Sequence, residues 1–157
     1  MSIAALYLPD PAATEAAGAR LARRLAGGMI VTLSGDLGAG KTTLVRGCLK
    51  ALGWAGPVKS PSYPLVEHYP LSSLYFYHFD FYRFADPGEW ETAGFAECFQ
   101  RDTVCLIEWP ERVGGLGGSP LLRTELGAAM AARGLADPGV YSLVEVLAPT
   151  LIDYAEP

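Results

Sequence analysis

The chain has 157 residues, 50% of them hydrophobic, and a formal net charge of −5 at pH 7. This length predicts one compact domain over residues 1–157 and excludes a second catalytic domain within it. The acidic balance argues against strong independent binding to nucleic acid. Because residues 1–9 lack a basic, apolar leader and no run of about 18 apolar residues occurs, we expect a cytoplasmic protein without a membrane segment.

The N-terminal part predicts a strand over residues 2–8 and then an Ala-rich helix that ends at Gly27-Gly28. Asp10 is a residue type that caps helices, and Pro11 suits the first helical position. Residues 29–33 are β-branched and apolar, which predicts a second strand, and residues 41–52 place apolar side chains on one helical face.

A glycine-rich loop joins this second strand to this second helix. Residues 35–42 read Gly-Asp-Leu-Gly-Ala-Gly-Lys-Thr and match the phosphate-binding pattern G-x-x-x-x-G-K-[ST]. Gly35, Gly38 and Gly40 permit backbone angles that turn successive N–H groups toward a phosphate, and the helix N-terminus adds positive potential. The order of strand, loop and helix therefore predicts a site for a nucleoside triphosphate.

Charge and reach assign roles within this loop. Lys41 is the expected cation for the β and γ phosphates, and the Thr42 hydroxyl is the expected ligand of Mg²⁺. Thr43 would bond an α or β phosphate. The remaining loop positions predicted to bind nucleotide are Asp36, Leu37 and Ala39. The alternative is a glycine-rich turn that only caps a helix, with Lys41 solvated.

The middle of the sequence predicts a proline-containing loop and a hairpin. Residues 59–64 cannot continue a helix, because each proline biases the residue before it toward extended geometry. Residues 65–69 and 74–84 are predicted strands, joined by a turn at 70–73. The second of these strands is aromatic on both faces, which favours a strand covered on both sides over a platform that stacks bases.

Two carboxylates stand out in otherwise apolar strands. Asp80 shares a strand face with Phe76 and His78, and a buried carboxylate is costly without a partner, so Asp80 is a candidate site residue. Glu108 ends the apolar strand 103–108, the position that places an acid beside the phosphate loop in this class of fold. Its side chain could approach Mg²⁺, directly or through water, or orient an attacking water. The alternative for Glu108 is a surface carboxylate at a strand end.

The remaining segments carry no evident chemistry. One or two short helices are predicted over residues 89–99, a flexible connection over 113–120, a helix over 121–133, a strand over 140–147 and a loose tail over 149–157. The fold class predicted is α/β: one P-loop NTPase domain with a mostly parallel sheet, some antiparallel strands and helices on both faces.

In these motifs the chain resembles the TsaE (YjeE) family, small bacterial ATPases required to make threonylcarbamoyladenosine in tRNA. The resemblance spans residues 10–112 and rests on motifs that occur in the same order: the phosphate loop with Arg46-Gly47 behind it, Val58-Lys59-Ser60-Pro61-Ser62-Tyr63, His78-Phe79-Asp80-Phe81-Tyr82-Arg83, and Ile107-Glu108-Trp109-Pro110. Ser62 stands where the family usually has Thr, which keeps a hydroxyl. The Ala-rich stretch after residue 113 departs from the family's strand-rich ending.

The resemblance implies roles for specific positions. Lys41, Thr42 and Thr43 would hold ATP and Mg²⁺, Glu108 would serve the metal and Asp80 would support hydrolysis. The other implied contacts are Trp109 near the nucleotide, Asp10 and Thr14 near the base, and Ser60, Pro61 and Ser62 in a nucleotide-sensing switch loop. The family's ATPase joins paired TsaB and TsaD proteins, so tRNA would be a partner only indirectly.

The leading hypothesis is a Mg²⁺-dependent ATPase that acts through a TsaB–TsaD type complex. No arginine finger can be assigned from the sequence, so intrinsic turnover should be slow. Arg83, Arg101 and Arg112 are too scattered to form the arginine-bearing lid that a small-molecule kinase usually has. A P-loop small-molecule kinase and a nucleotide-switched protein-binding module with incidental hydrolysis remain alternatives.

Overall fold

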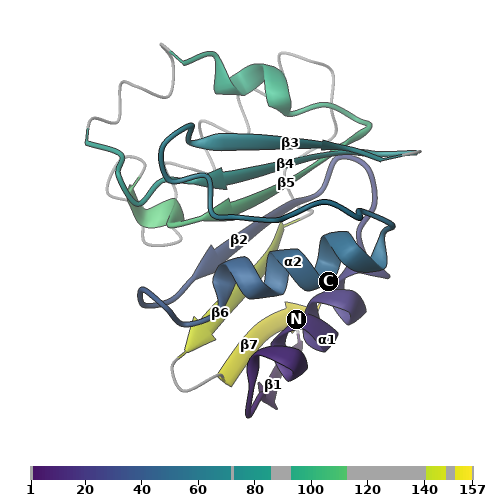
Figure 1. The fold of residues 1–157 in the computed structure, drawn as a ribbon, viewed down its shortest axis with the longest axis vertical. Coiled ribbons are helices and arrows are strands. Elements are labelled where there is room, and N and C mark those ends of the chain that lie inside the picture. The colour runs from purple at the N-terminus through teal and green to yellow at the C-terminus, as the bar shows by residue number, and fades with distance from the viewer. Residues whose placement is uncertain (1, 72, 86–92, 113–140, 148–150, 157) are drawn as a thin grey trace.

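The computed structural model describes residues 2–71, 73–85, 93–112, 141–147 and 151–156 (Figure 1). Its elements are, in chain order, β1 (Ser2–Tyr7), α1 (Pro11–Ala22), β2 (Ile30–Ser34), α2 (Lys41–Ala51), β3 (Val66–Pro70), β4 (Tyr75–Asp80), the 3₁₀ helix η1 (Phe95–Cys98), β5 (Thr103–Glu108), the 3₁₀ helix η2 (Pro110–Arg112), β6 (Tyr141–Leu147) and β7 (Leu151–Glu156).

The seven strands of the described residues form one sheet in the order β1-β7-β6-β2-β5-β4-β3. The four central strands β6, β2, β5 and β4 are parallel. The outer strands are antiparallel: β3 pairs with β4, and β7 pairs with both β6 and β1. This arrangement confirms the predicted mixed α/β fold with a mostly parallel sheet, and the hairpin predicted around residues 70–73 is the β3–β4 pair.

Helices α1 and α2 pack against each other on one face of the sheet (Figure 1). Their backbones approach closely because glycines lie at the contact: a Cβ added to Gly47 would lie 2.1 Å from the carbonyl oxygen of Glu15, and one added to Gly18 would lie 2.1 Å from that of Leu44. Leu44 also belongs to the same buried core cluster as Val31 and Leu106 of the sheet, so α2 is anchored to the sheet as well as to α1.

The other face of the sheet is covered by aromatic side chains. Phe79 of β4 stacks on Phe99 with ring centroids 5.8 Å apart and meets Phe95 edge-on at 5.4 Å. Among the described residues this face carries the short 3₁₀ helix η1, whereas α1 and α2 both lie on the opposite face. The prediction of helices on both faces is therefore met on this face only by a 3₁₀ helix. Strand β5 is buried along its whole length, as expected for a strand covered on both sides.

Two predicted boundaries were wrong, each for a local reason. The helix after Asp10 ends at Ala22 rather than at Gly27, although Asp10 does cap it, accepting a hydrogen bond from Ala13 N at 2.8 Å. The strand predicted to reach residue 84 ends at Asp80. There the Asp80 carboxylate accepts a hydrogen bond from the Tyr82 backbone N–H at 2.9 Å, a turn that ends the strand.

The prediction of a loose tail over residues 149–157 was also wrong. Leu151–Glu156 is strand β7, and its backbone pairs with β6 on one side and β1 on the other. Six residues give little periodicity, and the pairing depends on two strands distant in sequence. The predicted connection at 113–120 and the predicted helix at 121–133 lie outside the described residues, as do residues 89–92 of the predicted helical segment 89–99. Within the described remainder of that segment the structure has the 3₁₀ helix η1.

Candidate functional site

A cleft of about 410 Å³ lies where β4 and β5 end and α2 begins. It is lined by residues from the phosphate loop, the proline-containing loop and the ends of the two strands: Leu37, Gly38, Gly40, Lys41, Thr42, Thr43, Ser60, Ser62, Asp80, Tyr82, Arg83, Glu108 and Trp109. In parallel sheets, ligands bind at the carboxyl ends of the strands, which is the end that this cleft occupies.

The phosphate loop has the backbone that its glycines predict. Gly38 and Gly40 adopt φ angles of 79° and 113°, in the region that disfavours residues with a side chain. Gly40 is the residue before α2, so its conformation delivers the loop directly into the helix N-terminus. The first turn of α2 therefore presents backbone N–H groups to the cleft, together with the positive end of the helix dipole.

Lys41 is folded into this loop and is only 4% exposed. Its ammonium group donates to the carbonyl oxygens of Gly35 at 2.6 Å and Asp36 at 2.8 Å. The same nitrogen lies 4.4 Å from the ring centroid of Trp109, a cation–π contact. These contacts hold a positive charge at the wall of the cleft.

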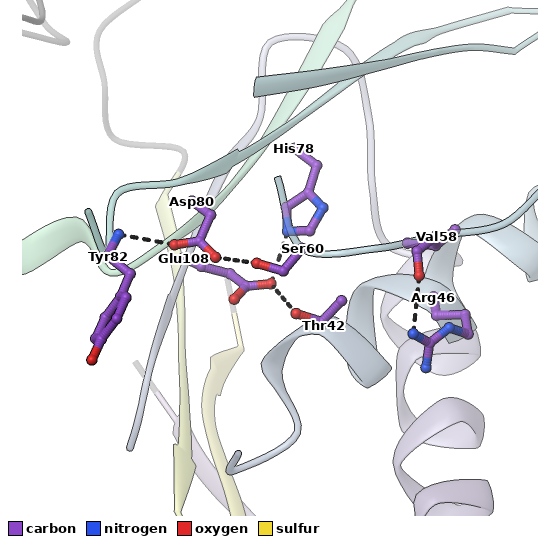
Figure 2. A network of polar contacts seen from close by, with 8 residues as sticks. All are labelled: Thr42, Arg46, Val58, Ser60, His78, Asp80, Tyr82 and Glu108. Carbon is purple, nitrogen blue, oxygen red and sulfur yellow. Dashed lines mark hydrogen bonds and ion pairs between the residues drawn. The ribbon is translucent and has the colours of Figure 1, made fainter. Parts of the chain in front are cut away.

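Glu108 meets Thr42 and His78 in the wall formed by α2 and the strand ends (Figure 2). The Thr42 hydroxyl donates to Glu108 Oε1 at 2.8 Å, and His78 Nε2 lies 2.8 Å from the same oxygen. Both Glu108 and His78 are buried. Because the carboxylate oxygen accepts, Nε2 carries the hydrogen of this bond, and Nδ1 is buried without a partner in the structure.

Asp80 lies beside Glu108 because the two residues are register partners in the parallel pair β4–β5. The Ser60 hydroxyl donates to Asp80 Oδ2, and Tyr82 N donates to Oδ1 at 2.9 Å (Figure 2). Asp80 is 3% exposed, so these two donors compensate the burial of its charge. The carboxylate thereby links strand β4 to the proline-containing loop.

The proline-containing loop is tied to the structure at both ends. Arg46 of α2 donates from Nη2 to the carbonyl oxygen of Val58 at 2.9 Å, which fixes the start of the loop (Figure 2). At the other end Asp80 N of β4 donates to Leu65 O at 3.1 Å, and within the loop Leu65 N donates to Pro61 O at 2.8 Å. Leu65 has a φ of 67°, a strained angle for a residue with a side chain. The residues between these ends are not paired in the sheet, and Ser60 among them is held by its side-chain bond to Asp80.

Trp109 follows Glu108 with a φ of 56°, so the chain turns sharply after β5. Its ring lies 5.0 Å from that of Tyr82, and the Arg112 guanidinium lies 5.1 Å from the Tyr82 ring centroid. Trp109 and Tyr82 both line the cleft. This side of the site therefore offers aromatic surface next to the Lys41 ammonium group.

The structure brings most of the predicted site residues together. The cleft-lining set includes Lys41, Thr42, Asp80, Glu108 and Trp109, while Gly35 and Asp36 contribute carbonyls to Lys41. Six predicted residues do not line the cleft: Asp10, Thr14, Gly35, Asp36, Ala39 and Pro61. Asp10 caps α1 and Thr14 is buried in that helix, so their predicted contacts to a base stay predictions.

Sequence reasoning gave no role to His78, Tyr82 or Arg83. His78 lies two residues before Asp80 and therefore on the same face of the strand. This spacing is the signal that could have predicted a position of His78 near Glu108. Tyr82 and Arg83 carry no such signal, because they follow the strand and reach the cleft only through the turn at Asp80.

The donor set suits a small, hard cation that retains water ligands. In the parts of the chain that the structure describes, no group of three or more His, Cys, Asp and Glu side chains is placed to enclose a metal ion. Thr42 and Glu108 instead offer one hydroxyl and one carboxylate beside the glycine-rich loop, and a donor pair of this kind can hold Mg²⁺. No described helix has the length and apolar character needed to cross a membrane.

Fold and cleft together define an α/β protein built around a strand, a glycine-rich loop and a helix. The chain belongs to the TsaE family: the family described as threonylcarbamoyl adenosine biosynthesis protein TsaE matches residues 8–133. This confirms the resemblance seen in the motifs.

Similar proteins carry the same description. The chain is 53% identical over 88 residues to the tRNA threonylcarbamoyladenosine biosynthesis protein TsaE of Haemophilus influenzae, a match that covers 56% of each chain. It is 36% identical over 122 residues to the protein of that name from Rickettsia felis, covering 77% of this chain and 71% of the other. The crystal structure of Bacillus subtilis YdiB superposes with a TM-score of 0.64 at 25% identity, covering 98% of this chain and 83% of that one.

Proposed function

We propose that this chain is a cytoplasmic Mg²⁺-dependent ATPase that supports the formation of threonylcarbamoyladenosine in tRNA through a TsaB–TsaD type protein complex. The observation that carries the proposal is the hydrogen bond of 2.8 Å between Thr42 and Glu108, next to the Lys41 ammonium group. A hydroxyl, a carboxylate and a cation therefore lie together where the glycine-rich loop meets α2, which supports a site for a phosphate and its metal. The names of the relatives supply the pathway.

The residues of the cleft would divide the work by charge. Lys41 and the N–H groups of the loop would bind the β and γ phosphates, and Thr42 and Glu108 would hold Mg²⁺. The metal would neutralise charge on the phosphates. Asp80 or Glu108 would position water for in-line attack, since both carboxylates are buried beside the same cleft.

The link to tRNA is proposed to be indirect. Residues 67–111 hold nine Asp or Glu against two Arg, and the chain as a whole is acidic, which disfavours direct binding to a polyanion. A protein partner that carries the tRNA is compatible with this charge.

Complementation tests the proposal. A bacterial strain whose own TsaE gene is deleted lacks threonylcarbamoyladenosine. The wild-type chain should restore the modified nucleoside, as measured by mass spectrometry, whereas Lys41→Ala should not. Lys41→Ala should also abolish Mg²⁺–ATP binding in calorimetry. Lys50→Ala is the matched control: Lys50 is on the same helix, but is exposed and paired with Glu15 at 3.2 Å. Normal ATP binding by Lys41→Ala would contradict the proposed site.

A second candidate, a nucleotide-switched docking module, is favoured by the bond from Ser60 to Asp80. This bond connects the proline-containing loop to a proposed catalytic carboxylate, so the loop could report the state of the phosphate. A pull-down of the TsaB–TsaD type complex in the presence of a non-hydrolysable ATP analogue or ADP separates the two functions. Docking that depends on the nucleotide, with modification retained in hydrolysis-defective variants, would favour the switch.

A further inference from the structure

Arg83 is a cation in the cleft wall to which the proposed mechanism gives no task. The cleft is lined by two cations, Lys41 and Arg83, and by two carboxylates, Asp80 and Glu108. A nucleoside triphosphate with one Mg²⁺ remains an anion, so two carboxylates beside it call for more positive charge than Lys41 alone supplies. Arg83 is the remaining cationic side chain of the cleft-lining set.

In this structure the Arg83 guanidinium rests on an aromatic ring. Its central carbon lies 4.6 Å from the ring centroid of Tyr63. No carboxylate of the described residues forms an ion pair with it. Tyr63 is 83% exposed, and a cation–π contact at so exposed a site is weak and readily exchanged for a phosphate.

Both partners of this contact belong to segments that are bonded to Asp80. Arg83 follows the turn in which Tyr82 N donates to Asp80, and Tyr63 lies in the loop whose Ser60 hydroxyl donates to the other oxygen of Asp80. One buried carboxylate is therefore bonded both to the turn before the guanidinium and to the loop that carries the ring.

We propose that Arg83 binds the terminal phosphate of the nucleoside triphosphate, and that in doing so it exchanges the Tyr63 ring for phosphate oxygens. The guanidinium is the side chain best suited to this exchange, since it stacks on aromatic faces and bonds phosphate with paired N–H groups. The inference rests on the proposed function. It adds that Arg83 distinguishes ATP from ADP, and that nucleotide binding frees Tyr63 in the proline-containing loop.

Calorimetry with Mg²⁺–ATP and with Mg²⁺–ADP tests the assignment without reference to turnover. Arg83→Met should weaken ATP binding by roughly 10- to 100-fold, the loss of a charged hydrogen bond, and change ADP binding by less than about 3-fold. Arg83→Lys should fall between wild type and Arg83→Met, because it keeps the charge but not the paired donors. Arg83 is exposed, so these variants should have the same melting temperature as the wild type.

Lys59→Met is the matched control, because Lys59 is an exposed cation that does not line the cleft. It should leave both affinities within about 3-fold of wild type. Tyr63→Phe should behave as wild type, whereas Tyr63→Ala should raise ATP affinity by about 2- to 5-fold, since the competing ring is gone.

The outcomes separate this inference from the function on which it rests. If the wild-type chain binds neither nucleotide, the proposed function fails. If wild type binds Mg²⁺–ATP and Arg83→Met weakens ATP and ADP binding equally, or weakens neither, only the role of Arg83 is overturned. Equal losses in Arg83→Met and Lys59→Met would likewise overturn it, because they would show a general effect of charge.

Discussion

The two carboxylates of the cleft are held by different kinds of structure. Glu108 is bonded by Thr42 at the start of α2 and by His78 within β4, both in elements packed into the core. Asp80 is bonded by Ser60, which belongs to a loop without sheet pairing, and by a backbone N–H in a turn. We call the first group the helix wall and the second the loop wall. The partners of Glu108 are therefore held in place by the packing of the core, whereas the side-chain partner of Asp80 lies in a loop that is not paired in the sheet.

The largest expected effect falls on both walls alike. Glu108→Ala and Asp80→Ala should retain nucleotide but lose hydrolysis by on the order of 100- to 1000-fold, the cost typical of removing one group that stabilises or positions the reacting atoms. Phosphate release and calorimetry measure the two properties. Glu67→Ala, an exposed acid on β3, is the control and should behave as wild type. Undiminished phosphate release by either cleft variant would remove that carboxylate from the mechanism.

The helix wall should respond to changes in its packing far from the cleft. Gly47→Ala places a Cβ 2.1 Å from the Glu15 carbonyl oxygen, so α1 and α2 must separate. We expect a loss of about 1–3 kcal/mol in the free energy of unfolding, measured with denaturant, and weaker ATP binding as α2 shifts. Ala16→Ser, at an exposed position of α1, should change neither. A free energy of unfolding equal to that of wild type for Gly47→Ala would show that the two helices can separate at this point without a loss of stability.

High pH should also lower the free energy of unfolding, through a buried thiol in α2, the helix that carries Thr42 of the helix wall. Burial raises the pKa of the Cys48 thiol in α2 from its ordinary value of 9.0 to about 12. The unfolded thiol ionises first, so stability is intact below pH 9 and should fall by about 1.4 kcal/mol per pH unit as pH rises toward 12. Burial raises the pKa of Cys105, Tyr69 and Tyr77 in the same direction.

Denaturant titrations at pH 8 and pH 10 compare wild type with Cys48→Ala. The variant should lose less stability between the two pH values, although the other buried groups leave part of the slope. Identical slopes would show that Cys48 does not titrate as its burial predicts.

The smallest effect is expected in the loop wall. Ser60→Ala removes one hydrogen bond to Asp80, worth about 0.5–1.5 kcal/mol, so hydrolysis should fall by only about 2- to 10-fold while ATP binding persists. Hydrogen exchange of residues 60–64 should rise in Ser60→Ala and not in Glu108→Ala. Equal exchange in both variants would erase the distinction between the two walls.

The elements were predictable where local chemistry decides them. The glycine pattern, the Asp10 cap and the apolar strand before Glu108 each depend on residues within a few positions, and each is found at the predicted place. The end of β4 was missed because a side-chain bond to the backbone at Asp80 outweighs the aromatic run that follows it. Strand β7 was missed because its hydrogen-bond partners lie elsewhere in the chain.

The sequence by itself determined the glycine-rich loop with its lysine and threonines and the two carboxylates of the site, since the loop pattern and two acids in apolar strands are visible without any fold. Only the tertiary structure decided how they meet. The register of β4 on β5 puts Asp80 beside Glu108, the packing of α2 puts Thr42 against Glu108, and the turn after β4 brings Arg83 to Tyr63. These contacts join residues far apart in the chain, and no local pattern encodes a distance between strands that is set by hydrogen-bond register.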